Sequence, residues 1–370
     1  MTGQRIVVLG GGFGGAAAAR TARKLLGPGH AVTLVDRRKR TYLCGSLPWL
    51  VVGEREPLKV SRSLGALAQR GIEYVQAEAE GIDLSGRRVK TSRGVLPFDR
   101  LVVATGAEYD WGAVPGSAEA HSFYSIETAR RLRDAFRRFK RGRIAIAVGG
   151  LPYKCPPAPF EMAFLLESSL VGRGIRGSAE IDVFTPEPTP LGVAGPDAPT
   201  SLRALLEKRG IGLHAGEAVE AVEGGSGEMR FKSGRKERYD LVVTVPVHRS
   251  APQVREAGLV NESGWIPVNA ETLETKHAGV YAIGDATAIP MANGRPMPKA
   301  GVFASTAGEV AARNIAAGIV GGETAGFTGE GYCFIGYSSD KAAMVKGTFL
   351  AEGKPDVAYL PPSVRWHRGK

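Results

Sequence analysis

Long apolar runs are missing from this chain of 370 residues, and cysteine and histidine are scarce in it. No segment reaches the ~18 to 20 consecutive apolar residues of a membrane-spanning helix, which excludes an integral membrane protein. The three cysteines, Cys44, Cys155 and Cys333, are spaced too widely for a C-x-x-C redox pair, a zinc ribbon or a C-x-x-C-H haem attachment. The six histidines show no paired ligand spacing, so we expect no metal site.

Positive charge is in excess. The formal net charge is +11, and part of the excess lies in residues 37–40 and 130–143. The second segment has the pattern of an amphipathic helix with Leu132, Phe136 and Phe139 on one side. No recognised motif with interleaved aromatic residues accompanies the charge, so we expect no nucleic-acid partner. A solvated surface, an acidic protein partner or peripheral contact with an anionic lipid surface fits the charge instead.

The composition is that of a soluble globular chain. Hydrophobic residues make up 43% and charged residues 23%, which excludes a disordered tail protein or a collagen-like repeat. The length suggests about two domains. The 50 glycines exceed average usage about twofold and are typical of the many tight turns of α/β nucleotide-binding enzymes.

The N-terminal segment has the pattern of a dinucleotide-binding βαβ unit. An apolar strand at residues 5–9 leads into a glycine-rich turn at residues 10–15, and residues 16–26 have helical composition. A second apolar run at residues 31–35 ends at Asp36. Because strand, turn, helix, strand and acid follow in this order, the pattern favours dinucleotide binding over a flexible glycine loop.

Four residues of this unit are predicted to contact the dinucleotide or shape its site. Gly10 permits the tight turn, Gly12 lets the backbone approach a pyrophosphate, and Gly15 lets the helix and the strand pack closely. The helix N-terminus then faces the phosphates with unpaired N–H groups. Asp36 is placed to accept hydrogen bonds from a ribose.

Two later segments indicate which dinucleotide binds. Each is an apolar strand that ends in a short motif: residues 101–104 run into Thr105 and Gly106, and residues 279–283 run into Gly284 and Asp285. The carboxylate of Asp285 is suited to ribityl hydroxyl groups, with the following helix aimed at the pyrophosphate. These segments resemble the Ala-Thr-Gly and terminal Gly-Asp motifs of flavoproteins with two dinucleotide-binding domains, which implies FAD in the first site.

In such flavoproteins a second βαβ unit usually binds NADH, and here its glycine motif is broken. A strand at residues 144–148 is followed by two glycines and then by Leu-Pro-Tyr-Lys-Cys-Pro-Pro-Ala-Pro-Phe-Glu at residues 151–161. Four prolines restrict the backbone and remove N–H donors that a pyrophosphate needs, so NADH binding is disfavoured. A rigid loop instead presents Cys155, with Glu161 at the start of a helix predicted over 162–170, whose N-terminus stabilises a thiolate.

We therefore predict an α/β fold with two Rossmann-like dinucleotide-binding domains, as in disulfide-reductase-like flavoproteins, plus a short C-terminal segment. The FAD-binding domain is split over residues 1–115 and 246–320. The second Rossmann-like domain, with its degenerate NAD site, spans residues 116–245. Residues 321–370 form the C-terminal segment, which we expect over the flavin.

Composition alone would make the three cysteines small buried hydrophobic residues. Local context favours a reactive role for two of them. Cys155 lies in the proline loop, and Cys333, within Gly-Tyr-Cys-Phe-Ile-Gly at residues 331–336, begins an apolar strand late in the chain. Two-domain flavoproteins bring such a segment over the flavin, so a disulfide between the two would cross the isoalloxazine.

The run Cys-Pro-Pro-Ala-Pro-Phe-Glu at residues 155–161 resembles a motif of the flavoprotein subunit of flavocytochrome c sulfide dehydrogenase and, more loosely, of sulfide:quinone oxidoreductases. Residues 264–268, 282–285 and 297–301 resemble segments of that family in the same order. Residues 42–55 are similar to the segment whose cysteine, in the flavocytochrome type, bonds the flavin. The resemblance extends to about residue 345.

The resemblance implies a redox-active disulfide between Cys155 and Cys333, with Glu161 as the acid/base beside it. Hydrosulfide attacks this disulfide, which leaves a persulfide on one cysteine and a thiolate on the other, and the thiolate passes two electrons to FAD. By analogy Cys333 is the flavin-side thiolate, while the sequence leaves open which sulfur is attacked. The resemblance also implies that Lys299 supplies a nearby cation or contacts the flavin N1/C2=O end. The alternative is that Lys299 is a surface lysine.

Cys44 corresponds to the cysteine that forms a thioether with the flavin 8α-methyl group in the flavocytochrome type. The Pro-Trp pair at residues 48–49 looks more like the quinone-reducing relatives. The chain lacks the long C-terminal amphipathic segments of those relatives, which favours a soluble acceptor such as a c-type cytochrome. No signal peptide is visible before the first strand, so we expect a cytoplasmic protein, or a periplasmic one if the numbering begins at a processed start.

Our main hypothesis is an FAD-dependent sulfide dehydrogenase that oxidises sulfide to zero-valent sulfur or polysulfide and passes electrons to a c-type cytochrome subunit. The alternative is a sulfide:quinone oxidoreductase, held to a membrane surface by its basic charge and the tail around Trp366. An NADH-dependent coenzyme A disulfide reductase or NADH:quinone reductase is disfavoured by the broken second glycine motif. The fourth hypothesis is a non-enzymatic flavoprotein whose cysteines are merely buried.

Overall fold

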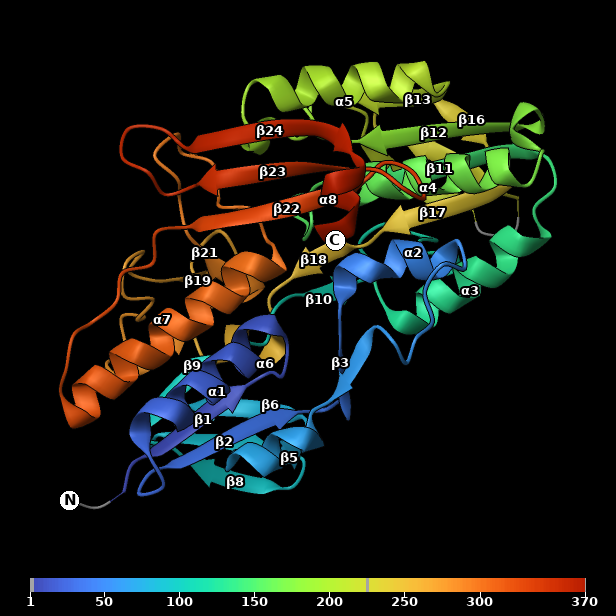
Figure 1. Cartoon of the computed structure of the whole chain (residues 1–370). Helices are drawn as coiled ribbons and strands as arrows, with labels where there is room; N and C mark the ends of the chain where they lie inside the picture. Colours follow the sequence, from blue (N-terminus) through green and yellow to red (C-terminus); the bar gives the residue numbers. More distant parts are fainter. Residues whose placement is uncertain (1–2, 224–225, 370) are drawn as a thin grey trace.

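The computed structural model describes residues 3–223 and 226–369, and two parallel sheets and one antiparallel sheet organise the fold (Figure 1). The first is a five-stranded parallel sheet in the order β20-β9-β1-β2-β5. Its strands are β1 (Arg5–Leu9), β2 (Ala31–Asp36), β5 (Glu73–Gln76), β9 (Arg100–Val103) and β20 (Val280–Ala282). One strand therefore comes from a much later part of the chain than the other four.

The centre of this sheet follows from its sequence. β1 is apolar in its last four residues, all buried, and it pairs in parallel with β2 on one side and β9 on the other. The helix α1 (Phe13–Leu26) connects β1 to β2 and packs against α7 (Gly301–Val320). A Cβ atom on Gly308 would lie 2.2 Å from the carbonyl oxygen of Gly14, so the close approach of the two helices requires glycine there.

The second sheet is parallel, with the strand order β13-β12-β11-β17. Its strands are β11 (Gly142–Val148), β12 (Ala179–Thr185), β13 (Ile211–Ala215) and β17 (Leu241–Val245). The elements around it are α3 (Ile126–Arg138), α4 (Ala158–Gly172), α5 (Asp197–Lys208) and the antiparallel strands β14 (Val219–Glu223), β15 (Glu228–Phe231) and β16 (Lys236–Arg238). Two short strands, β10 (Glu108–Asp110) and β18 (Val247–Arg249), pair antiparallel where the chain passes between the two parallel sheets.

The C-terminal part is a three-stranded antiparallel sheet followed by a short helix. Its elements are β22 (Glu330–Gly336), β23 (Ala342–Thr348), β24 (Asp356–Ser363) and α8 (Val364–Gly369). β22 contacts both α4 and α7, and β24 contacts α5. In Figure 1 this sheet, drawn in red, accordingly lies beside both earlier units and bridges them.

The remaining elements are short. They are β3 (Arg40–Tyr42), α2 (Leu47–Val51), β4 (Ser61–Ser63), β6 (Ala79–Asp83), β7 (Arg88–Thr91), β8 (Gly94–Pro97), α6 (Pro252–Glu256), β19 (Ile266–Pro267) and β21 (Thr287–Ala288). Among the residues that the structure describes, no helix combines the length and the apolar character needed to cross a bilayer.

The predicted α/β class, with two parallel sheets and a separate C-terminal segment, is confirmed, but three helices differ from expectation. α3 ends at Arg138, and Phe139 is an extended C-cap residue that leads toward β11. α4 begins at Ala158 rather than at residue 162, because its first turn tolerates the prolines around it. No α-helix directly follows Gly284 and Asp285, since a 3-10 turn and β21 come first and α7 begins only at Gly301.

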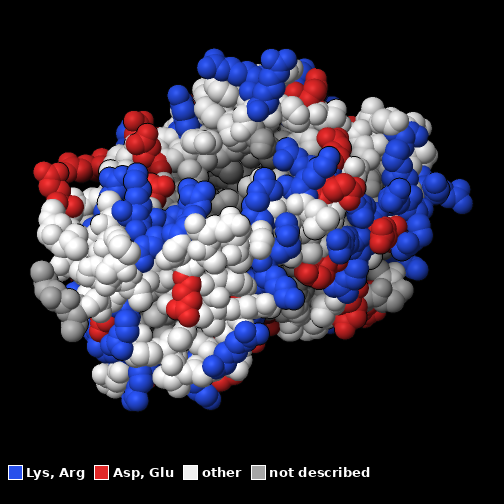
Figure 2. Space-filling view, turned by 60° about the horizontal axis from the view of Figure 1, so that its bottom comes forward, with Lys and Arg blue, Asp and Glu red and all other residues white. Residues whose placement is uncertain are grey.

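Basic side chains are concentrated on one part of the surface. The exposed basic residues of α3 and the segment after it are Arg130, Arg131, Arg137, Arg138, Lys140 and Arg141. Figure 2 shows Lys and Arg spread over the face in view, with many of them along its right-hand side. The excess positive charge along α3 therefore lies on the surface, where these side chains are exposed.

Candidate functional site

Close backbone contacts shape the glycine-rich loop between β1 and α1. Gly10 has a φ of 102°, and a Cβ atom there would lie 2.3 Å from the carbonyl oxygen of Ala104. A Cβ atom on Gly15 would lie 1.8 Å from the carbonyl oxygen of Gly10. At Gly12, by contrast, no described atom lies within 4 Å of that position. The loop therefore excludes side chains at Gly10 and Gly15 for internal reasons and leaves open space before the α1 N-terminus at Gly12.

Asp36 closes this loop from the end of β2. Its buried carboxylate accepts hydrogen bonds from the N–H of Gly11 at 2.7 Å and the N–H of Arg38 at 2.8 Å, and it pairs with the Arg38 guanidinium at 3.2 Å. Burial alone would raise the pKa of Asp36, but the hydrogen bonds and charge of Arg38 outweigh it and lower that pKa below its usual value. The carboxylate is therefore ionised at neutral pH.

β9 ends beside the same loop. Gly106 has a φ of 68°, which allows the turn there. The hydroxyl oxygen of Thr105 is buried and has no hydrogen-bond partner among the described residues. Because an unpaired buried hydroxyl is costly, this position is one where a bound ligand would supply the missing partner.

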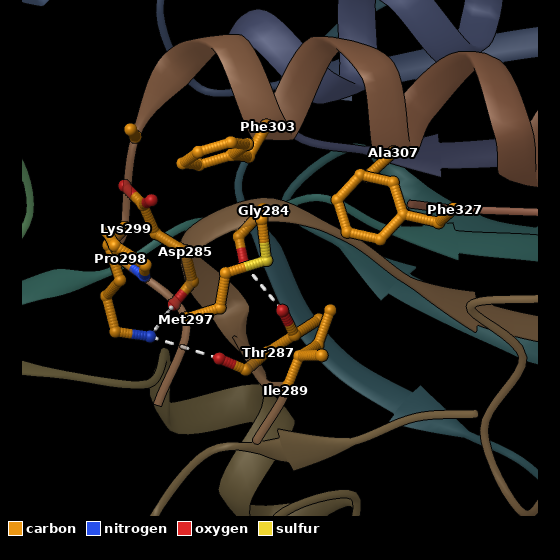
Figure 3. Close-up of a pocket in the computed structure, with 11 residues that line it drawn as sticks. Gly284, Asp285, Thr287, Ile289, Met297, Pro298, Lys299, Phe303, Ala307 and Phe327 are labelled. Atoms are coloured by element: carbon orange, nitrogen blue, oxygen red, sulfur yellow. Dashed lines mark hydrogen bonds between the residues drawn. The ribbon is translucent and has the colours of Figure 1, made fainter. Parts of the chain in front are cut away.

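Lys299 ties the motif after β20 to the segment that precedes α7. Its Nζ donates hydrogen bonds to the carbonyl oxygens of Asp285 at 2.7 Å and Thr287 at 3.1 Å, as the dashed lines in Figure 3 show. It also lies 3.5 Å from the centroid of the Trp265 ring. Burial lowers the pKa of Lys299 to about 8, although the Asp285 carboxylate opposes the shift. Lys299 is only 8% exposed, so it is not a surface lysine.

A small cavity of about 20 Å³ lies between the turn at Gly284 and α7 (Figure 3). Its apolar lining residues are Ile289, Met297, Phe303, Ala307 and Phe327. Asp285 and Lys299 border it as well. The cavity therefore has mostly apolar walls and a few polar groups, and its volume is that of about one water molecule.

The loop between β11 and α4 differs from the first glycine-rich loop in its third residue. A Cβ atom on Gly149 would lie 2.9 Å from the carbonyl oxygen of Val245, and one on Gly150 would lie 3.1 Å from Cγ2 of Val247, contacts comparable to that at Gly10. The third residue after the strand is Gly12 in the first unit and Leu151, which is 50% exposed, in the second. A side chain therefore stands where the first loop has open space, and the expectation that the second unit disfavours NADH stays a prediction.

Cys155 lies in this loop, just before α4. It has a φ of 57°, in the left-handed region, and its N–H donates a hydrogen bond of 2.7 Å to the carbonyl oxygen of Lys299. Lys299 stands two residues before α7, so the bond joins the cysteine loop to the N-terminus of that helix. Cys155 therefore lies at the junction of the two dinucleotide-type units.

Glu161 lies in the first turn of α4 and is 2% exposed. The indole N–H of Trp49, on α2, donates a hydrogen bond to its Oε1 at 2.9 Å. A Cβ atom on Gly336, in β22, would lie 2.9 Å from the same oxygen. The ring of His367, on α8, contacts the Trp49 ring with centroids 5.3 Å apart. The acid is thus enclosed by segments from distant parts of the chain.

Cys333 lies in the middle of β22 and not at its start, as the sequence had suggested. At one end of the strand, a Cβ atom on Gly331 would lie 2.5 Å from the ring of Phe303, in the first turn of α7. At the other end, Gly336 approaches Glu161 in α4. Because the loop of Cys155 joins the same two helices, both cysteines belong to the region between the N-termini of α4 and α7.

Cys44 is exposed and begins a 3-10 turn between β3 and α2. Its Sγ lies 3.7 Å from the carbonyl oxygen of Tyr42. The basic side chains of Arg38 and Lys154 lie within electrostatic range of its sulfur. The third cysteine is therefore on the rim of the same region, accessible from outside.

The sequence did not predict a cluster beside Cys155 that consists of Lys154 and the rings of Tyr109, Tyr124 and His248. The Lys154 Nζ lies 4.8 Å from the ring centroid of Tyr109 and 5.9 Å from that of Tyr124. Burial opposes its charge, but Tyr109, Cys44 and Asp285 outweigh burial and raise the pKa of Lys154. The cluster places a stable positive charge next to Cys155. No local pattern signals it, because its members come from separate segments.

His248 completes this cluster. Its ring contacts those of Tyr109 and Tyr124 with centroids 5.1 and 5.3 Å apart, and its Nδ1 lies 2.8 Å from the carbonyl oxygen of Pro246. Burial, with the charge of Lys154, lowers the pKa of His248 to about 3, so the ring is neutral. Its Nε2 is buried without a hydrogen-bond partner in the described part of the chain. Within that same part, no group of His, Cys, Asp and Glu side chains could hold a metal ion.

Comparisons with known proteins identify relatives of this chain. The sulfide-quinone reductase of Aquifex aeolicus is 28% identical over 306 residues, which cover 80% of this chain and 71% of that protein. Demethylphylloquinone reductase NdbB of Synechocystis sp. is 27% identical over 338 residues, which cover 86% of this chain and 80% of that protein.

The fold has a close counterpart among solved structures. The sulfide:quinone oxidoreductase of Aquifex aeolicus superposes with a TM-score of 0.89 at 24% identity and covers 99% of this chain and 88% of that one. The fold is thus that of the FAD-dependent disulfide oxidoreductases. A family model described as pyridine nucleotide-disulphide oxidoreductase matches residues 4–307. The chain belongs to the pyridine nucleotide-disulphide oxidoreductase family.

Proposed function

We propose that this chain is an FAD-dependent enzyme that oxidises sulfide to zero-valent sulfur and passes the electrons to a quinone. The names of the relatives support both halves of this proposal, because the Aquifex protein is a sulfide-quinone reductase and the Synechocystis protein reduces a quinone. A quinone acceptor replaces the c-type cytochrome of our main sequence hypothesis as the better supported choice.

The residues of the first unit suit FAD. The open space at Gly12 before the α1 N-terminus would take the pyrophosphate, and the ionised Asp36 would take a ribose. The buried hydroxyl of Thr105 needs a partner that a bound cofactor would provide. Asp285, beside the cavity, is the residue that would accept hydrogen bonds from the ribityl chain.

One observation carries the sulfide half of the proposal. In the second unit a proline-rich loop takes the place of the pyrophosphate loop, and the backbone of its Cys155 is hydrogen-bonded to Lys299 beside the first unit. The chain thus uses the junction where a nicotinamide would meet the flavin to present a sulfur atom. Cys333 on β22 approaches the same junction, which supports a redox pair of Cys155 and Cys333.

The chemistry of that pair balances for sulfide. One hydrosulfide breaks the disulfide and leaves a persulfide on one cysteine and a thiolate on the other; a second hydrosulfide removes the outer sulfur as HS₂⁻ and leaves two thiols. FAD, when bound, takes the two electrons as the disulfide forms again. The N-terminus of α4 and the ammonium group of Lys154 stabilise the thiolate, and Glu161 accepts or returns the proton.

The acceptor side is supported by the cavity beside Lys299. Its apolar side chains, which include Met297, Phe303 and Phe327, are of the kind that a quinone ring contacts, but the cavity would have to widen well beyond its present volume to admit one. A c-type cytochrome is the second candidate acceptor. It is favoured by the exposed position of Cys44, which corresponds to the cysteine that bonds the flavin in the flavocytochrome type.

A stopped-flow comparison of reductants and oxidants tests the proposal. Sulfide should bleach the visible absorbance of the bound flavin rapidly, whereas NADH should bleach it slowly or not at all. A soluble ubiquinone analogue should then restore the colour faster than cytochrome c does. Rapid bleaching by NADH and none by sulfide would reject the proposal. If cytochrome c oxidises the reduced flavin faster than the ubiquinone analogue does, a c-type cytochrome rather than a quinone is the acceptor.

A further inference from the structure

Glu187 stands where a dinucleotide-binding βαβ unit places the acid that holds a ribose. β12, the second strand of the second unit, ends at Thr185, and Glu187 follows two residues later. In the first unit Asp36 is itself the last residue of β2. The partners of Asp36 belong to its own glycine-rich loop and to Arg38, whereas the hydroxyl of Tyr153, from the cysteine loop, donates a hydrogen bond to Oε2 of Glu187 at 3.2 Å.

Tyr153 belongs to the cysteine loop. Its side chain is 3% exposed, and its hydroxyl oxygen also lies 3.0 Å from the carbonyl oxygen of Pro156, so its single proton is shared between that carbonyl and Glu187. Burial and the charge of Glu187 raise the pKa of Tyr153 well above its usual value, so the hydroxyl stays a neutral donor. This hydroxyl therefore stands between the loop on the far side of Cys155 and an acid just after β12, and its one proton serves both acceptors.

Two features of the cysteine loop disfavour a nucleotide beside this contact. The N–H of Ala158, the first amide of α4, is bonded to the carbonyl oxygen of Cys155 at 2.8 Å, and the next residue, Pro159, has no N–H. Two of the first three residues of α4 therefore offer no free amide to a pyrophosphate.

We propose that Tyr153 is a positioning residue for Cys155, and that it uses Glu187, the ribose-type carboxylate of the second unit, as a fixed anchor for the cysteine loop. The contact that holds the sulfur in place then also competes with a ribose for the carboxylate. The inference rests on the proposed function only for the chemistry that Cys155 performs.

Four variants separate this anchor from general packing. Tyr153→Phe removes the hydroxyl, and Glu187→Leu removes the acceptor. Glu187→Gln retains a hydrogen-bonding side chain and serves as the conservative rescue. The matched control is Tyr239→Phe, which removes a buried tyrosine hydroxyl that donates to Asp182 of β12 at 3.1 Å, away from the loop.

Two measurements on the FAD-loaded protein test the proposal. Amide hydrogen exchange of residues 149–158 should become about tenfold faster in Tyr153→Phe and in Glu187→Leu, as expected for the loss of one buried hydrogen bond. The rate of flavin bleaching by sulfide should fall at least about tenfold in both, because small displacements of a reacting atom are costly. Flavin content should stay unchanged, and Glu187→Gln and Tyr239→Phe should behave like wild type. The double variant should be no slower than either single one.

Unchanged exchange at residues 149–158 in both single variants would overturn the proposal. So would additive effects in the double variant, or bleaching of the wild-type flavin by NADH as fast as by sulfide. A wild type that sulfide does not bleach would defeat the proposed function alone, because the exchange measurement needs no sulfide and would still decide whether Tyr153 anchors the loop.

Discussion

Trp49 and Glu161 are 112 residues apart in the chain, and the indole N–H of the first donates a hydrogen bond of 2.9 Å to the carboxylate of the second. Glu161 is 2% exposed, so this bond satisfies an acid that has almost no access to solvent. The same indole lies against His367 of α8. A single tryptophan therefore links the acid of α4 to the C-terminal helix.

Trp49→Phe should lower the free energy of unfolding by about 1.5 to 3 kcal/mol, because a buried carboxylate loses a hydrogen bond from the protein. Urea denaturation of the FAD-loaded protein measures the change. Glu161→Gln keeps an oxygen that accepts from the indole, so it should cost less stability than Trp49→Phe. It should nevertheless slow flavin reduction by sulfide and alter the pH profile of that step. An unaltered profile would remove Glu161 from proton transfer.

Lys299 should make stability depend on pH at alkaline values. Burial lowers its pKa to about 8 from the usual 10.5, so the unfolded chain binds the extra proton between these values. The contribution of Lys299 to stability therefore increases as the pH rises from about 8 to 10.5, by about 1 to 3 kcal/mol. The difference in unfolding free energy between wild type and Lys299→Met, measured across that range, should rise and should be flat below pH 7. A flat difference throughout would contradict the shift.

Gly15→Ala should impair folding, whereas Gly12→Ala should impair FAD binding. A methyl group at Gly15 would lie 1.8 Å from the carbonyl oxygen of Gly10, so that variant should lose stability or fail to fold. At Gly12 no described atom is within 4 Å and the backbone φ of −73° suits alanine, so the apoprotein should remain stable. FAD affinity should still fall, because the methyl group enters the space for the pyrophosphate. Thermal unfolding of the apoprotein and flavin titration measure the two effects, and normal FAD binding by Gly12→Ala would argue against the site.

Cys155→Ser and Cys333→Ser should each abolish flavin reduction by sulfide while FAD stays bound. Each substitution removes one sulfur of the proposed pair and leaves the first unit untouched. Stopped-flow absorbance gives the rate, and the flavin-to-protein ratio gives the binding. Retained turnover in both variants would reject the disulfide mechanism.

Precipitation with acid tests whether Cys44 is bonded covalently to FAD. If its sulfur forms a thioether with FAD, the precipitated wild-type protein stays yellow and Cys44→Ser gives a colourless pellet. The exposed position of this thiol leaves it accessible to a cofactor at the rim of the site. A colourless wild-type pellet would show that FAD is held without a covalent bond.

The sequence predicted the local parts of the site better than their assembly. The turn geometry at Gly10, Gly12 and Gly15 could be inferred because it depends on a few adjacent residues. The broken second motif was likewise visible, since the prolines around Cys155 are consecutive in the chain.

Contacts between distant segments could not be inferred in this way. The indole of Trp49 on Glu161, the rings of Tyr109 and Tyr124 around Lys154, and the carboxylate of Glu187 beneath Tyr153 all join residues far apart in the chain. No periodicity or spacing reports such pairs. The helix after Gly284 and Asp285 was also placed too early, because nothing in the motif reveals that a 3-10 turn and β21 come first.

The position of β22 between α7 and α4 bears on biogenesis. The strand that carries Cys333 is synthesised after the strands of both parallel sheets. The proposed pairing of Cys155 with Cys333 therefore has to wait for the last three strands of the chain, and a nascent chain that stops before β22 lacks one of its two sulfurs.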